Sequence, residues 1–295
     1  MKKIRIVIIV ILVTGFVFRN DLGSLFKQAT AQQGNGTKNK KQSKSGSNGS
    51  AAVEIIEKWD LPAALLEVSA IAYLDADRFA CVQDENGVIF IFNKKTGEIE
   101  REIRFADPGD FEGLCLAGNT AYAVRSDGLI FEIDLSTEKS IVYKTYLTAK
   151  NNIEGLSFDA ANKRLLLAGK NADENYPGYK CIYAFDLGTK ELLTAPAIKI
   201  SLSDPLLGGN QQKMNKALRP SAIAIHPHTL DIFITDGPAS RLLQLSKDGD
   251  VKKMYSLGKA FSQPEGITFS PAGKLYISNE GNKNAGNIIE IVLPD

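Results

Sequence analysis

From Val53 to the C-terminus, short runs of alternating apolar and polar residues are separated by turn residues. The segments IFNKKTGEI, IDLSTEKSI, FDLGTKEL and LSKDGDV each place Asn, Asp or Gly between two such runs. Alternation with a period of two is typical of half-buried strands, and these turn residues supply the backbone angles that tight hairpins need. Sustained helical periodicity is almost absent, so the pattern predicts an all-β domain.

A repeated unit organises these strands. A small residue or a Glu-Gly pair, followed by alternating apolar residues, recurs in EVSAIAYL, FEGLCLAG, IEGLSFD, PSAIAIHP and PEGITFSP. The matching positions Glu67, Glu112, Glu154, Ser221 and Glu265 are 45, 42, 67 and 44 residues apart. A period of about 40–45 residues with four strands per unit indicates the blades of a β-propeller.

The count of strands gives the number of blades. Four units contain four strands each, whereas the last unit ends at Asp295 after three. The segment VEIIEKWDL at 53–61 can supply the missing strand, which would close the ring and leave no exposed sheet edge. We therefore predict a single five-bladed propeller of four-stranded blades over 53–295. The 67-residue interval contains the insertion SDPLLGGNQQKMNKALRP, and this insertion leaves a sixth blade open.

The first 20 residues carry an export pattern. Lys2, Lys3 and Arg5 precede an apolar run from Ile6 to Phe18, as in a secretory signal. The small-x-small site Ala29-Thr30-Ala31 lies late for cleavage. We therefore expect residues 1–20 to remain as a membrane anchor with a cytoplasmic basic end, which places the body on the periplasmic or cell-surface side. Secretion to the periplasm after signal cleavage is the alternative.

A linker follows this anchor. Residues 32–50, QQGNGTKNKKQSKSGSNGS, contain no apolar side chain and no acid. Such a stretch cannot bury enough surface to offset its ordering entropy, so 21–52 are predicted to form a flexible tether.

Composition adds one restriction on partners. The chain has 35 Lys and Arg against 34 Asp and Glu, but residues 1–50 hold nine basic residues and one acid. Residues 51–295 therefore hold 26 basic and 33 acidic side chains, a net charge of −7. An acidic body disfavours nucleic acid as a partner, because phosphate binding needs clustered cations. We expect a monomeric body that contacts the membrane through its anchor and binds an envelope protein or a small ligand.

Cys81, Cys115 and Cys181 lie in apolar runs and are predicted to be buried, unreactive thiols.

Charged residues are expected to converge at one end of the channel. In a propeller the first strand of each blade lines the channel, and its start shares a face with the loops between second and third strands. The glutamates that start these strands are Glu112, Glu154, Glu67 and Glu265, and the loops add Asp84 at the same mouth. The ligand-binding candidates from the loops are Glu85, Lys170, Arg125, Asp236, Asn279 and Glu280.

Carboxylates this close would raise each other's pKa unless a cation lay among them. Ca²⁺ suits such a group, because it takes six to eight oxygen ligands in flexible geometry and extracellular sites can be weak. The alternative is structural: the glutamates bond backbone amides or pair with Lys170, Arg125 and Arg219. Zn²⁺ is disfavoured, since the sequence has no Cys/His set at ligand spacing.

The ordered run of LLEVSAIAY, CVQDENGVIF, DFEGLCL, IEGLSFD, LLLAGK, RPSAIAIHP, QPEGITF and KLYISNEG resembles the SdiA-regulated family of bacterial proteins. These are exported or membrane-tethered propellers related to NHL-repeat proteins. The resemblance covers about 54–293 and implies a five-bladed propeller with a Ca²⁺ site. Glu112 and Glu154 are the first candidates for that site, followed by Glu67, Glu265 and Asp84. Blade four has Ser221 where the motif has Glu, so the ring of acids is incomplete.

Two functions from different classes remain open. The first is a non-enzymatic, Ca²⁺-stabilised module that presents its mouth to a ligand or protein of the cell envelope. The second is a Ca²⁺-dependent hydrolase of the lactonase, esterase or phosphoesterase type, in which Glu154 or Glu112 would activate water and Lys170 or Arg125 would steady negative charge. The sequence lacks the common nucleophile and phosphate-binding motifs. His226 and His228 are predicted to lie on the face opposite the carboxylates, so neither can complete a catalytic triad with them.

Overall fold

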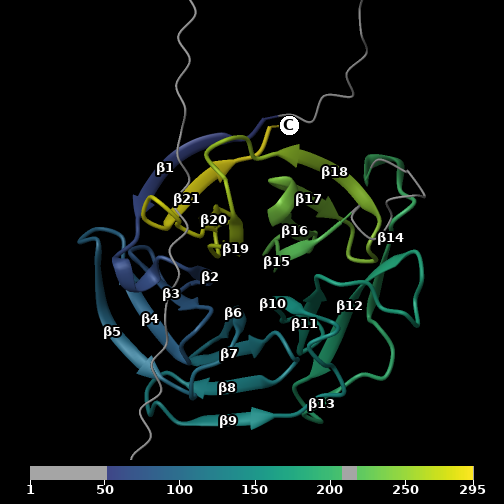
Figure 1. Ribbon diagram of the computed structural model, residues 1–295, viewed down its shortest axis with the longest axis horizontal. Coiled ribbons are helices and arrows are strands. Elements are labelled where there is room, and N and C mark those ends of the chain that lie inside the picture. Colours follow the sequence, from purple (N-terminus) through teal and green to yellow (C-terminus); the bar gives the residue numbers. More distant parts are fainter. Residues whose placement is uncertain (1–51, 208–217, 295) are drawn as a thin grey trace, which may run out of the picture. The chain divides into compact units, whose positions relative to one another are not determined.

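The alternating segments form five antiparallel sheets in the computed structural model, which describes residues 52–207 and 218–294. The innermost strands β2, β6, β10, β15 and β19 surround a common axis, and successive strands lie farther out (Figure 1). The first two blades are β2 (Val68–Tyr73), β3 (Arg78–Gln83), β4 (Val88–Asn93) and β5 (Glu98–Arg104), then β6 (Phe111–Ala117), β7 (Thr120–Arg125), β8 (Ile130–Asp134) and β9 (Ser140–Tyr143). The fold is the predicted all-β, five-bladed propeller.

Blade 3 contains the long interval of the repeat. It consists of β10 (Ile153–Asp159), β11 (Arg164–Gly169), β12 (Tyr179–Asp186), β13 (Glu191–Leu192) and β14 (Ile198–Ser201). Both β13 and β14 pair with β12, so together they form the outer edge of one blade. A short 3₁₀ turn, η2 (Pro205–Leu207), follows. Over the described parts of this interval, the extra residues therefore lengthen blade 3 and form no sixth sheet.

The first and last strands of the propeller meet in the fifth blade. Blade 4 is β15 (Pro220–Ile225), β16 (Ile232–Asp236), β17 (Arg241–Leu245) and β18 (Val251–Ser256), with η4 (Gly237–Ala239) after β16. Blade 5 is β19 (Pro264–Phe269), β20 (Leu275–Asn279) and β21 (Asn287–Val292), completed by β1 (Glu54–Asp60). The antiparallel pairing of β1 with β21 confirms the predicted closure of the ring. A further 3₁₀ turn, η1 (Ala63–Leu65), leads from β1 into blade 1.

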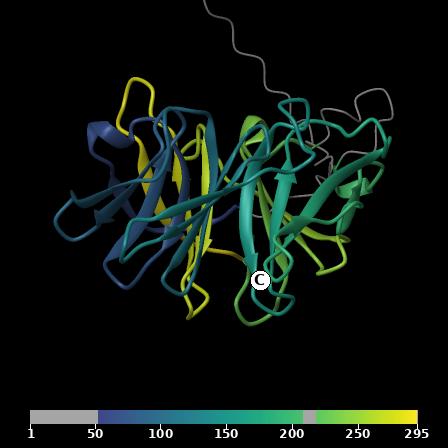
Figure 2. The ribbon, with the colours of Figure 1, turned by 90° about the horizontal axis from the view of Figure 1, so that it is seen from below.

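Side-chain caps explain the turns that the sequence pattern marked. The third strands of blades 1, 2 and 3 end in Asn93, Asp134 and Asp186. Each side-chain oxygen accepts the backbone N–H groups two and three residues later. These Asx turns reverse the chain without unsatisfied backbone donors. Seen from the side, the strands run between two opposite faces where the connecting loops lie (Figure 2).

The apolar core is divided among the five interfaces between neighbouring blades. One cluster, for example, joins Ala70 and Ile89 of blade 1 to Leu114 and Phe131 of blade 2. Equivalent clusters join blades 2 and 3, 3 and 4, 4 and 5, and 5 and 1. Burial of apolar surface therefore stabilises the arrangement of the blades around the axis as well as each sheet.

Three further expectations concern burial and the N-terminus. Cys81, Cys115 and Cys181 are buried free thiols, as predicted. The predicted anchor at 1–20 and all of the linker at 21–52 except Ala52 lie outside the described residues. No helix in the described segments is long and apolar enough to cross a membrane.

Candidate functional site

A β-bulge marks the same position in all five innermost strands. The pairing of first and second strands skips one residue in each blade, between Val68 and Ala70, Phe111 and Gly113, Ile153 and Gly155, Pro220 and Ala222, and Pro264 and Gly266. The skipped residues are Ser69, Glu112, Glu154, Ser221 and Glu265. A bulge re-aims the side chain of its extra residue, and this ring of five positions forms the channel mouth.

The register in blade 1 corrects one sequence expectation. The sequence repeat aligns Glu67 with the glutamates of the other blades, but in the structure Ser69 occupies the bulge position of blade 1. Glu67 instead lies two residues before the bulge, as do Asp110, Asn152, Arg219 and Gln263 in the other blades. The mouth thus has an outer rim of five polar residues and an inner ring of three glutamates and two serines.

Lys170 and Glu154 form an enclosed ion pair in this ring. Lys170 Nζ lies 2.6 Å from Glu154 Oε2, and the two side chains are 19% and 4% exposed. Asn152 Nδ2 donates to Glu154 Oε1 over 2.5 Å. Burial acts to lower the pKa of Lys170, but the charges of Glu154, Glu265 and Glu112 outweigh it and raise that pKa. Lys170 is therefore a charged ammonium beside the glutamates. Of the pairings in the structural alternative, the described residues show that of Lys170 with Glu154, whereas Arg125 pairs with Asp127.

A second lysine supports this arrangement. Lys180 on β12 is fully buried and donates from Nζ to the backbone oxygen of Lys170 over 2.7 Å. Burial lowers the pKa of Lys180 to about 8, against the opposing charge of Asp236. Sequence reasoning missed Lys180, because a single lysine in the strand YKCIYAFD is indistinguishable from one on a solvated face.

The other two glutamates carry strongly shifted pKa values. Burial, together with the negative charges of Glu154, Asp110 and Glu265, raises the pKa of Glu112 to about 9. Burial raises the pKa of Glu265 to about 7, while Lys170 acts to lower it. Among the described residues, no hydrogen bond or ion pair reaches either carboxyl group. The surroundings therefore favour the protonated form of both carboxyl groups, and more strongly that of Glu112.

The two serines of the ring connect neighbouring blades. Ser69 Oγ donates to the backbone oxygen of Phe111 over 2.6 Å, and Ser221 Oγ donates to that of Pro264 over 2.5 Å. Phe111 and Pro264 directly precede the glutamates of the next blade. The serines thus hold the backbone from which Glu112 and Glu265 project.

A second group of acids lies where blade 5 meets blade 1. Burial and then the charges of Glu67, Glu85 and Asp110 raise the pKa of Asp84. Burial and the charges of Asp84 and Glu67 raise that of Glu280. Asp84 Oδ1 and Asn279 Oδ1 are buried and have no hydrogen-bond partner. The predicted residues Asp84 and Glu280 are therefore close enough to interact, and two enclosed oxygens near their loops lack donors.

Three loop residues predicted to contact a ligand have other contacts. Arg125 pairs with Asp127 over 2.6 Å. Asp236 is 1% exposed and pairs with Arg241 over 2.7 Å. Asn279, also 1% exposed, donates to Asn287 Oδ1 over 2.9 Å. Glu85, in contrast, is exposed at the same face. Arg125, Asp236 and Asn279 thus support the mouth through contacts within the protein.

The donor set at the mouth fits calcium in kind. Calcium binds carboxylate, amide and backbone carbonyl oxygens as well as water. Asp84 Oδ1, Asn279 Oδ1 and the carboxyl groups of Glu112 and Glu265 are oxygens without a protein donor. The described residues contain no group of three or more His, Cys, Asp or Glu side chains arranged to hold a metal ion. An ion here would therefore draw further ligands from carbonyl oxygens and water.

Comparison with known proteins identifies the family. The SdiA-regulated family matches residues 50–284, which include most of the propeller. The chain belongs to the SdiA-regulated family. This membership confirms the resemblance drawn from the ordered motifs around the inner strands.

Solved structures support the fold of this SdiA-regulated protein. Glutaminyl cyclase from Myxococcus xanthus is similar with a TM-score of 0.58 and 13% sequence identity. The similarity covers 82% of this chain and 96% of the cyclase chain. At this identity the likeness shows a shared fold alone. No curated protein matches the chain.

Proposed function

We propose that the protein is an exported, membrane-tethered binding module whose acidic mouth takes calcium and presents a surface to an envelope ligand or protein. The observation that carries the proposal is the pair of enclosed oxygens without donors, Asp84 Oδ1 and Asn279 Oδ1, beside Glu280 and Glu67. A buried oxygen without a donor costs free energy that a bound cation would recover.

The charge distribution supports a cation at the seam between blades 5 and 1. Lys170 already neutralises Glu154 in the ring. Burial raises the pKa of both Asp84 and Glu280; the negative charge of Glu67 adds to the rise in both, and that of Asp84 adds to the rise in Glu280. A divalent ion beside Asp84 would reverse this repulsion. We therefore assign the principal role to Asp84, with Glu67 and Glu280 adding negative charge. Glu112 and Glu265 contribute once they lose their protons.

The test is a thermal melt of the full chain with calcium and with a chelator, for wild type and Asp84→Asn. A ligand at 100 times its dissociation constant stabilises a protein by about 2.7 kcal/mol. For a domain of this size, that corresponds to a rise in Tm of about 5–10 °C. We expect the rise in wild type, a smaller one or none in Asp84→Asn, and calcium in the purified protein by metal analysis.

Two comparisons make this melt specific. Asp248→Asn removes an exposed acid, 73% accessible at its side chain, and should leave the calcium shift unchanged. Calcium should also bind more tightly as pH rises from 6 to about 9, because Glu112 and Glu265 release their protons over this range. An equal shift in Asp84→Asn and wild type, or no shift in either, contradicts the calcium proposal.

A hydrolase is the second candidate, and the unequal surroundings of two neighbouring acids favour it. Glu154 pairs with Lys170, whereas Glu112 has no such partner among the described residues and its pKa is raised to about 9. Two carboxyl groups in different environments are typical of general acid–base sites. Glu112, whose surroundings favour the protonated form, would donate a proton, and Glu154 would accept one from water. Lys170 would steady the negative charge that develops on the substrate.

A panel of substrates separates the two candidates. It contains a lactone, an aryl ester, a phosphomonoester and, because a propeller of similar fold is a glutaminyl cyclase, a peptide with N-terminal glutamine. Turnover that is lost in Glu154→Gln but kept in Glu290→Gln would establish the enzyme. Glu290 is the matched control, since it pairs with Lys274 over 2.8 Å on the outer part of blade 5. Absence of turnover in wild type supports the binding module.

A further inference from the structure

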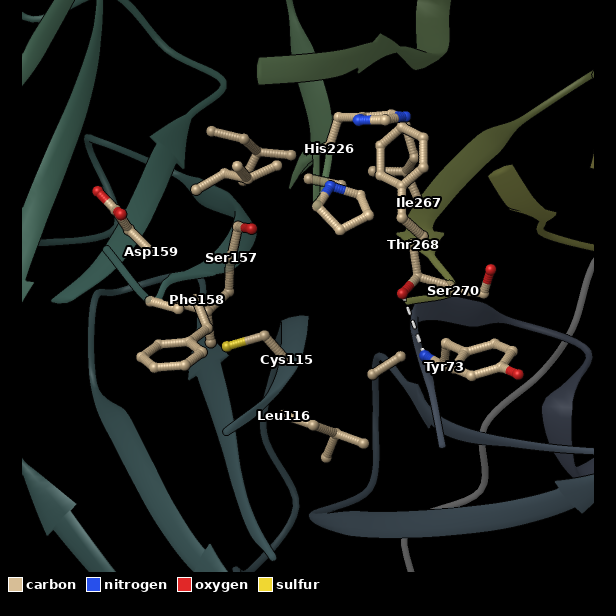
Figure 3. Close-up of a pocket in the computed structure, with 18 of the residues that line it drawn as sticks. Tyr73, Cys115, Leu116, Ser157, Phe158, Asp159, His226, Ile267, Thr268 and Ser270 are labelled. Atoms are coloured by element: carbon tan, nitrogen blue, oxygen red, sulfur yellow. Dashed lines mark hydrogen bonds between the residues drawn. The ribbon is translucent and has the colours of Figure 1, made fainter. Parts of the chain in front are cut away.

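A cavity of about 490 Å³ opens at the end of the channel opposite the glutamates. All five innermost strands contribute to its wall (Figure 3). Small residues line its inner part, at equivalent positions three residues after the bulge: Ala72, Cys115, Ser157, Ala224 and Thr268. We call this space the basal cavity. Its size results from the small side chains, since a large residue at any of these positions would occupy it.

An apolar ring separates the basal cavity from the channel mouth. Two residues after each bulge lie Ile71, Leu114, Leu156, Ile223 and Ile267, all 5% exposed or less. The space between this ring and the glutamates measures about 10 Å³, room for about one water molecule. A molecule in the basal cavity would therefore not reach Glu112 or Glu154, and the two ends of the channel are distinct sites.

The lining of the basal cavity carries no net charge. Asp159 is neutralised by Arg164, whose Nε lies 2.9 Å from its Oδ2. His226 Nδ1 accepts the backbone N–H groups of His228 and Thr229 over 3.2 and 3.1 Å. This leaves its proton on Nε2, and burial lowers its pKa. The remaining lining residues are apolar or uncharged polar residues.

Ser157 supplies a hydrogen-bonding group inside the cavity. Ser157 is 7% exposed, and no hydrogen bond reaches its hydroxyl group from the described residues. Its oxygen points into the cavity, whereas Thr268 Oγ1 opposite already accepts the backbone N–H of Tyr73 over 3.1 Å (Figure 3). The hydroxyl group is therefore open to the cavity, where a bound molecule can hydrogen-bond to it in place of water.

We propose that the basal cavity binds a neutral, mainly apolar small molecule that carries one hydrogen-bonding group for Ser157. The volume is typical of small-molecule sites, which are lined by apolar groups with a few placed polar ones. A charged ligand would lose its hydration without gaining an opposite charge. Phe158 and Phe269 are among the lining residues, and their flat apolar rings suit an aromatic or short aliphatic ligand.

The first test compares two fluorescent probes that differ in charge. Phenylnaphthylamine is neutral, and anilinonaphthalenesulfonate has the same ring system with an added sulfonate. Titrated into the full chain, the neutral probe should bind one site per chain, at least about tenfold more tightly than the sulfonate. Equal binding of the two probes, or no saturable binding of the neutral one, overturns the proposal.

The second test locates the probe. Leu116→Trp fills the cavity from β6 and should weaken binding of the neutral probe by about tenfold or more. Leu206→Trp makes the same exchange at a leucine that is 41% exposed and lies outside the cavity lining, and it should leave binding unchanged. If folded Leu116→Trp binds the probe with the same affinity as wild type, the probe binds elsewhere, for example on the apolar run at 6–18. That result refutes the proposed site.

A third variant keeps the proposal testable if Leu116→Trp does not fold, as judged by circular dichroism. Ser157→Ala removes only the hydroxyl group. It should weaken binding of naphthol by about two- to tenfold and leave naphthalene unaffected. Equal effects on both compounds contradict the assigned hydrogen bond. Size-exclusion chromatography tests one other occupant, a second copy of the chain. That occupant would be identified if wild type forms a dimer that does not bind the probe, and if Ser157→Ala or Leu116→Trp converts the dimer to monomers.

Discussion

Lys170 Nζ lies 2.6 Å from Glu154 Oε2, and this ion pair is enclosed between the inner strands of the propeller. Glu112 and Glu265 also face the lysine closely enough to raise its pKa. A single ammonium group therefore pairs with one carboxyl group and interacts with two more, and its removal should affect the whole mouth.

Lys170→Met should lower the free energy of unfolding by about 3–5 kcal/mol, because it leaves Glu154 buried without its partner. The loss should shrink as pH falls, because burial raises the pKa of Glu154 and removal of the Lys170 charge raises it further, so that Glu154 takes up a proton more readily in the variant. Urea unfolding at several pH values measures both effects. Lys190→Met breaks a more exposed pair with Glu132, 32% and 24% accessible, and should cost about 1 kcal/mol or less. Equal losses in the two variants would contradict the special role of Lys170.

Stability should decrease as pH rises, because of Glu112. Its pKa is about 9 in the folded protein against an ordinary 4.5. Between these values the folded state binds more protons than the unfolded state, so unfolding becomes easier with increasing pH. The contribution of Glu112 is fully present below 4.5 and is lost by about 9. Glu265 adds to the same slope up to about 7.

Glu112→Gln tests this pH dependence without changing the size of the side chain. Thermal melts without calcium should show a shallower decline in Tm from pH 5 to 9 than wild type, with the largest gain in Tm above pH 8. Glu98→Gln, at an exposed outer-strand glutamate, serves as the control. A variant with the same slope as wild type would show that Glu112 ionises normally.

Gly155→Ala should destabilise the contact between blades 3 and 4. A β-carbon at Gly155 would lie 2.9 Å from the backbone nitrogen of Ile223, which cannot move independently of its strand. Overpacking of this kind costs about 1–3 kcal/mol. Gly188→Ala, in an exposed turn with only Asp186 Oδ1 nearby, should change stability by less than about 0.5 kcal/mol. Similar urea midpoints for the two variants would refute the close approach.

Ser221→Ala should weaken the contact between blades 4 and 5. Ser221 Oγ donates to the backbone oxygen of Pro264, and the serine is 1% exposed. Loss of the donor leaves a buried carbonyl without this bond, at a cost of about 1–3 kcal/mol. Ser203→Ala removes an exposed hydroxyl that contacts only Ser201 and should be nearly neutral in urea unfolding. A neutral Ser221→Ala would mean that the two blades are held by apolar packing alone.

The sequence predicted the blades because each inner strand repeats the same backbone requirement. Gly113, Gly155 and Gly266 follow the bulge residue where the next blade approaches closely, and a β-carbon at each would meet that blade. In blade 1 the sequence repeat is two residues out of register with the structure. Glu67 aligns with the other glutamates by its charge, whereas Ser69 occupies the bulge position and bonds to the next blade. Backbone geometry, rather than charge, defines the repeat.

The candidate site was only partly predictable. The convergence of Glu112, Glu154 and Glu265 follows from their equal place in the repeat, and Lys170 follows from the loop that precedes the third strand. The partners of Arg125 and Asp236 depend on side-chain geometry that spacing does not encode. The sequence does not predict the basal cavity, because the cavity forms where five small side chains, far apart in the sequence, leave space between the inner strands. No single one of them differs from ordinary strand sequence.

The pairing of β1 with β21 sets an order on folding. Glu54 lies opposite Val292, 238 residues later in the chain, so the first strand to be synthesised has no partner until the last one emerges. Contacts this distant in sequence are slow to form. A chain that ends before Asn287 would leave β1 unpaired and the ring without its closing strand. The propeller can therefore close only after β21 has been synthesised. A truncation that removes β21 would destabilise β1, at the other end of the domain sequence.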